Sequence, residues 1–64
     1  MSAAIRHIHY KPQSEELSIW FDPQGRRYTY FGVPEAIYAS LRDADSRGRF
    51  FNQSIRGRYE CGLV

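Results

Sequence analysis

Two stretches with a period of two, on either side of a turn sequence, constrain the fold of this chain most. In residues 16–21 large apolar side chains occupy every second position, and in residues 26–31 two tyrosines do the same. Such alternation is typical of strands whose two faces differ in environment. The intervening Asp22-Pro23-Gln24-Gly25 has Pro and Gly where a type I turn prefers them. These residues therefore predict an antiparallel hairpin.

The remaining elements follow from similar signals. Residues 5–10 are rich in strand-forming side chains and lead into a polar stretch with Pro12, which predicts a first strand. Pro34 suits the first position of a helix over 34–43. Ser46 suits the N-cap of a shorter helix ending near residue 55, and Gly57 could end it in a left-handed conformation. Residues 59–64 are long enough only for a closing strand or a tail.

The predicted fold class is α+β, in one domain over residues 1–64. It is a three-stranded antiparallel meander followed by one longer and one shorter helix on one sheet face. Strand periodicity assigns a core face and a second face. The expected core face comprises Ile8, Tyr10, Leu17, Ile19, Phe21, Tyr28 and Tyr30, under a helix stripe of Val33, Ile37, Leu41 and Ala44 with Tyr38 at its margin.

Composition narrows the class of protein. A chain of 64 residues buries a small core, and its aromatic share of 16% means that large rings carry much of it. The lone Cys61 cannot close a disulfide within the chain, and no Cys and His spacing typical of structural zinc is present. The sequence contains neither a signal-peptide-like apolar run nor a membrane-length one. We expect a cytoplasmic protein without membrane attachment.

Charge is distributed unevenly along the chain. Residues 1–45 carry five basic and six acidic side chains, whereas residues 46–64 carry four arginines against Glu60. Arginine suits phosphates, and amide side chains can read base edges. The predicted nucleic-acid surface therefore comprises Arg47, Arg49, Asn52, Gln53, Arg56 and Arg58, with the stripe 49, 52, 53 and 56 opposite the apolar side of the second helix. The alternative is an ordinary solvated surface, its arginines paired with Asp43, Asp45 or Glu60.

The second sheet face supplies the other candidate residues. Trp20 and Arg27, with His7 and His9 nearby, would lie there without a second layer to cover them, as in a stacking platform. The alternative is that the tail, the second helix or a second copy of the chain covers Trp20. Tyr28 and Tyr30 could also stack on bases, but periodicity favours core packing for both.

Other chemistries have little support in the sequence. His7 and His9 project to the same side of a strand, but no third ligand is placed to complete a metal site. No nucleophile with a recognisable base, no glycine-rich phosphate loop and no carboxylate pair in an apolar context indicates an enzyme. We expect a binding module that requires no cofactor or metal.

Several motifs in order along the chain resemble the KTSC family, named for a domain at the C-terminus of some lysyl-tRNA synthetases. They are Ala4-Ile5, Tyr10-Lys11-Pro12, Leu17-Ser18-Ile19-Trp20-Phe21, Tyr28-Thr29-Tyr30-Phe31-Gly32-Val33-Pro34 and Ser46-Arg47-Gly48-Arg49-Phe50-Phe51-Asn52. The ending Tyr59-Glu60-Cys61 departs from the Tyr-Pro-Tyr-like ending that the family leads us to expect.

The resemblance implies a fold more than an activity, and its link to synthetases suggests RNA binding. Together with the arginines it predicts a module that binds RNA, either tRNA or a single strand, with Trp20 and Arg27 as stacking or cation–π groups. The alternative is a protein-interaction or homodimerisation module that uses the face bearing Trp20.

Overall fold

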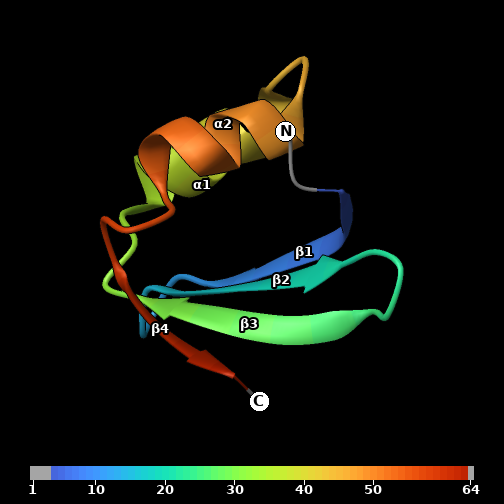
Figure 1. Cartoon of the computed structure of the whole chain (residues 1–64). Coiled ribbons are helices and arrows are strands. Elements are labelled where there is room, and N and C mark those ends of the chain that lie inside the picture. The colour runs from blue at the N-terminus through green and yellow to red at the C-terminus, as the bar shows by residue number, and fades with distance from the viewer. Residues whose placement is uncertain (1–3, 64) are drawn as a thin grey trace.

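The computed structural model describes residues 4–63 and has the predicted α+β architecture (Figure 1). Its elements follow in the order β1 (Ile5–Lys11), β2 (Glu16–Phe21), β3 (Arg26–Phe31), α1 (Glu35–Asp43), α2 (Arg47–Ser54) and β4 (Glu60–Leu63). The four strands form one antiparallel sheet in the order β1-β2-β3-β4. The meander is therefore confirmed, and the C-terminal segment adds a short fourth strand beside β3.

Both helices lie over the same face of the sheet, as Figure 1 shows. Pro34 is the extended N-cap residue of α1, one position before the helical place predicted for it. Ser46 caps α2 as predicted, because its side-chain oxygen accepts a hydrogen bond from the Arg49 backbone N–H at 3.2 Å. Gly57 has a φ of +75° after α2, a conformation that glycine adopts readily.

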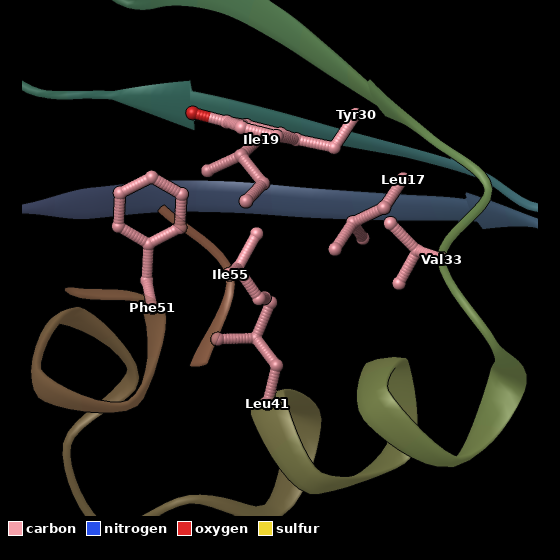
Figure 2. Close-up of a cluster of buried hydrophobic side chains, with 7 residues drawn as sticks. All are labelled: Leu17, Ile19, Tyr30, Val33, Leu41, Phe51 and Ile55. Atoms are coloured by element: carbon pink, nitrogen blue, oxygen red, sulfur yellow. The ribbon is translucent and has the colours of Figure 1, made fainter. Parts of the chain in front are cut away.

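The core lies between the helices and the sheet. Its buried side chains point toward one another from the sheet, the β3–α1 linker, α1 and the end of α2 (Figure 2). They are Leu17, Ile19, Tyr30, Val33, Leu41, Phe51 and Ile55. The other residues expected on the core face of the sheet, Ile8, Tyr10, Phe21 and Tyr28, are partly buried against this cluster.

Tyr10 ties the first strand to the helical layer. Its hydroxyl donates a hydrogen bond to the Val33 carbonyl at 2.6 Å. Its ring stacks on Tyr38 of α1, with centroids 4.7 Å apart and an interplanar angle of 9°. The position of α1 over β1 therefore depends on one hydrogen bond and one aromatic pair as well as on burial.

The β2–β3 connection is not the type I turn that the sequence predicts. The Asp22–Pro23 peptide is cis, and the closing hydrogen bond runs from the Gly25 N–H to the Phe21 carbonyl at 2.7 Å, four residues apart. Arg6 reaches this turn from β1. Its Nε lies 2.7 Å from the Asp22 carboxylate, and its Nη2 donates to the Pro23 carbonyl at 3.1 Å. A contact distant in sequence thus contributes to the shape of the turn.

The buried side of α2 differs from the predicted one. Gly48 and Phe51 are buried, the C-cap residue Ile55 is fully buried, and Asn52 is half-buried beside them with its Oδ1 shielded from solvent. Spacings of three and four residues place these positions on one helix face. Asn52 therefore belongs to the inward side of α2 and not to its solvent-facing stripe.

Neither helix in residues 4–63 combines the length and apolar character needed to cross a membrane.

Candidate nucleic-acid interface

The sheet face turned away from the helices presents a mixed aromatic and polar surface. Within residues 4–63 no helix or strand lies over this face (Figure 1). Alternation along the strands places on it His7, His9, Lys11, Glu16, Ser18, Trp20, Arg27, Thr29 and Phe31. We call this surface the open sheet face.

Trp20 lies at one end of the open sheet face and is half-buried by its neighbours there. It pairs across the sheet with His7 on one side and Arg27 on the other. The His7 ring centroid is 5.0 Å from that of Trp20, with a tilt of 48°. The Arg27 guanidinium carbon lies 5.8 Å from the indole centroid, within cation–π range. The indole is thus held in place while part of it remains accessible.

A depression of about 340 Å³ adjoins Trp20 in the open sheet face. Ser18 and Thr29, which face each other across β2 and β3, are buried in this surface, and their hydroxyl oxygens lie 3.1 Å apart in a hydrogen bond. Trp20, His9 and Phe31 also line it. The depression therefore combines a hydrogen-bonded polar pair with aromatic sides.

Phe31 is a second aromatic group on this face, and no functional role was predicted for it. It is 43% exposed, and a Cβ added to Gly62 of β4 would lie only 3.3 Å from its ring. Phe31 is four residues beyond Arg27 on β3, which corresponds to about 13 Å along the strand. Alternation along β3 assigns Phe31 to this face from the sequence alone. What the sequence does not show is that the Phe31 ring remains exposed there.

Two of the predicted arginines are engaged with helix ends. Arg47 Nη2 donates to the Arg42 carbonyl at the end of α1 at 3.0 Å. Arg58 Nε donates to the Gln53 carbonyl at the end of α2 at 3.2 Å. Both interactions place a positive charge where helix carbonyls are otherwise unsatisfied. These arginines thus have a structural role in addition to any binding role.

The other helix-side candidates lie in two places. Arg49 and Gln53 share a shallow hollow of about 250 Å³ with Asp45 and Phe50. Arg56 follows the end of α2 and lines a different hollow. The expected single stripe is therefore divided, because α2 ends at Ser54 and the chain changes direction there.

The acidic side chains suggested as internal partners form no ion pair with these arginines in residues 4–63, although Asp43 lies within the electrostatic influence of Arg47. Asp43 instead pairs with Arg42, with Nε and Oδ1 3.0 Å apart. The hydrogen bond from Arg42 and the positive charges of Arg42 and Arg47 lower the pKa of Asp43. In the part of the chain that the structure describes, Arg47, Arg49, Arg56 and Arg58 form no ion pair with a carboxylate. The C-terminal third keeps its excess of positive charge on the helix side.

The two groups of predicted site residues therefore lie on opposite sides of the molecule. Trp20 and Arg27 are on the open sheet face, whereas the C-terminal arginines are on or beside the helical layer. A short ligand segment cannot lie on both surfaces at once. The geometry separates a candidate stacking surface from a candidate electrostatic surface.

Tyr30 lies in the core, and the two histidines, His7 and His9, lie on the open sheet face, as strand periodicity predicts for these positions. Burial raises the pKa of the Tyr30 phenol, with a smaller contribution from a hydrogen bond with Cys61. Across residues 4–63, no three His, Cys, Asp or Glu side chains gather to hold a metal ion.

Comparison with known proteins finds relatives of this chain in both sequence and structure. The model of the KTSC domain matches residues 1–59. A KTSC domain protein of Yersinia pestis has a crystal structure that superposes with a TM-score of 0.90 at 39% identity, over 100% of this chain and 89% of that one.

Curated relatives include both long and short proteins. Lysine–tRNA ligase of Nostoc punctiforme is 34% identical over 58 residues, which are 91% of this chain. The chain spans 10% of the length of that ligase. An uncharacterised protein of Stutzerimonas stutzeri is also 34% identical, over 91% of this chain and 80% of its own length. The same domain thus occurs both within a synthetase and in proteins of similar size to this one.

Proposed function

This chain belongs to the KTSC domain family, and from that membership and its open sheet face we propose that it is a small module that binds single-stranded RNA. The observation that carries the proposal is Trp20, half-buried on an uncovered sheet face with Arg27 5.8 Å from its ring centroid. Proteins that bind single strands commonly stack bases on aromatic side chains and contact the backbone with cations.

The aromatic spacing supports a ligand of more than one base. Trp20 and Phe31 lie at different levels along the strands and both line the depression, as does His9 of β1. One base would stack beside Trp20 and another against Phe31. The hydroxyls of Ser18 and Thr29 would offer hydrogen bonds between these two contacts. A duplex would not expose its base faces to this surface, which favours an unpaired strand.

The family relationship supports RNA over other anions. Relatives that contain this domain include lysine–tRNA ligases, whose name specifies a tRNA substrate. In our proposal the domain contacts unpaired nucleotides of such an RNA, and the present chain uses the same surface.

The test is a titration with a short single-stranded RNA, measured by the anisotropy of a dye on the RNA. Trp20→Ala is expected to weaken binding about fivefold or more, because base–aromatic stacking contributes about 1–3 kcal/mol. Trp20→Phe should retain most of the affinity. The matched control, Arg49→Ala with Gln53→Ala, alters an exposed helix-side surface and should leave affinity within about twofold. Normal binding by Trp20→Ala would exclude this surface.

A second candidate function is protein interaction or homodimerisation through the same face. The exposed Phe31 favours it, because exposed aromatic groups contribute strongly to protein interfaces. Light scattering at low and high salt distinguishes the two functions. A dimer that persists at high salt and is lost in Phe31→Ser would support the interface, whereas a monomer under both conditions would oppose a homodimer.

A further inference from the structure

A second hollow lies on the helix side of the sheet, between the β2–β3 turn and the segment after α2. Its volume is about 310 Å³, and it is lined by Phe21, Asp22, Gln24, Arg26, Tyr28, Tyr30, Phe51 and Arg56. We call it the turn-side pocket. Alternation places Arg26, Tyr28 and Tyr30 of β3 on the face opposite to Arg27 and Phe31. The pocket is therefore separate from the open sheet face.

Aromatic rings with fixed orientations form most of the turn-side pocket. Tyr30 and Phe51 are buried, whereas Phe21 and Tyr28 are half-buried and present ring surface to the hollow. Phe21 packs edge to face against Phe51 at 5.2 Å and against Tyr28 at 5.7 Å between ring centroids. These mutual contacts preorganise the walls, so that a planar ligand could enter without rearranging the core.

The polar side of the pocket is positively charged. Arg26 from β3 and Arg56 from beyond α2 both line it and are exposed, and neither forms an ion pair with a carboxylate in residues 4–63. Asp22, the acidic residue in the lining, is already paired with Arg6 at 2.7 Å. Two arginines without carboxylate partners beside aromatic walls are complementary to a ligand that is both planar and anionic.

We propose that the turn-side pocket binds one nucleotide, with its base against Tyr28 and Phe21 and its phosphate between Arg26 and Arg56. The volume of about 310 Å³ is at the lower end for ligand pockets, which suits one nucleotide. The exposed Gln24 amide at the rim can donate to and accept from a base edge. This site is separate from the proposed stacking surface. It binds a free nucleoside monophosphate and does not require a longer RNA.

The test uses ¹⁵N-labelled protein titrated with the four nucleoside 5′-monophosphates and monitored by amide chemical shifts. Shifts are expected to concentrate on residues 21–28 and on the segment around Arg56. The matching nucleosides and inorganic phosphate, titrated separately, should each bind at least tenfold more weakly than the best nucleotide. Equal affinity for inorganic phosphate and for the nucleotides would overturn the assignment, because the aromatic walls would then contribute nothing.

Three variants separate this site from its surroundings. Arg26→Ala combined with Arg56→Ala should reduce nucleotide affinity at least tenfold, and both residues are exposed, so folding should be retained. Arg49→Ala is the matched control and should leave affinity unchanged. In Trp20→Ala the amide shifts around Arg56 should still respond to nucleotide, which distinguishes this pocket from the open sheet face. Unchanged affinity in the double arginine variant would overturn the proposal.

Discussion

The salt dependence of RNA binding can show whether RNA binds at the open sheet face or at the four C-terminal arginines, Arg47, Arg49, Arg56 and Arg58. Each phosphate neutralised on a single strand contributes about −0.7 to the slope of log affinity against log salt. Apart from histidines, the open sheet face carries two cations, Lys11 and Arg27. Lys11 lies 3.9 Å from the Glu16 carboxylate, but its side chain is 63% exposed, so the pair is weak.

Two phosphate contacts predict a slope of about −1.4, equivalent to a loss of affinity of about sevenfold between roughly 50 and 200 mM salt. Contacts from all four C-terminal arginines would instead give a slope of about −2.8 and a loss of about fiftyfold over that range. An interaction driven by apolar burial would change little. The three mechanisms are therefore separated by more than ordinary measurement error.

The assay follows the fluorescence of Trp20, the single tryptophan of the chain, during titration with a short single-stranded RNA at several salt concentrations. Arg27→Ala should reduce the magnitude of the slope to about 0.7, because one phosphate contact is lost. Arg49→Ala is the matched control and should leave the slope unchanged. A slope steeper than about −2.5 that is insensitive to Arg27→Ala would refute binding on the open sheet face, as would a slope near zero.

Three further predictions concern stability. Leu41→Ala should lower the free energy of unfolding by about 2–5 kcal/mol in urea denaturation, because Leu41 is fully buried. The total for a domain of this size is roughly 3–10 kcal/mol. A loss below about 1 kcal/mol would contradict the described packing. Arg6→Ala should cost at most about 1 kcal/mol, because its pair with Asp22 is exposed, and a larger thermal shift would mean that the turn depends on it more strongly. Burial raises the pKa of Tyr30, so the folded state keeps a proton that the unfolded chain loses above about pH 10, and stability should fall as pH rises further. In thermal melts, Tyr30→Phe should lose less stability above about pH 10 than the unmodified protein does. An identical loss in the two proteins would argue against Tyr30 as its cause.

Much of the fold could be predicted from local pattern. The predicted bounds of β2 and β3 coincide with those in the structure, and α1 begins one residue later than predicted. Strands and helices have short repeat periods, so a few neighbouring side chains are enough to specify them. The same alternation placed Trp20 on the face opposite to the core, because successive side chains of a strand point to opposite faces of the sheet.

The β2–β3 turn and the inward side of α2 could not be predicted in this way. The turn contacts Arg6, sixteen residues before Asp22, and local turn preferences contain no information about such a partner. Asn52 was assigned to the solvent side of α2 from a helical wheel, which gives relative directions but not which direction meets the sheet. In the structure, Gly48, Phe51 and Ile55 are buried, and this brings Asn52 inward.

Local periodicity was enough to predict the first three strands, the two helices and the chemical character of each sheet face, because these depend on a few neighbouring residues. Which candidate residues lie together depends on the tertiary structure. It separated Trp20 and Arg27 from the C-terminal arginines and brought Arg26 and Arg56, thirty positions apart, to one aromatic pocket. Those distances depend on how the helical layer sits on the sheet, which is determined by packing between segments far apart in the chain.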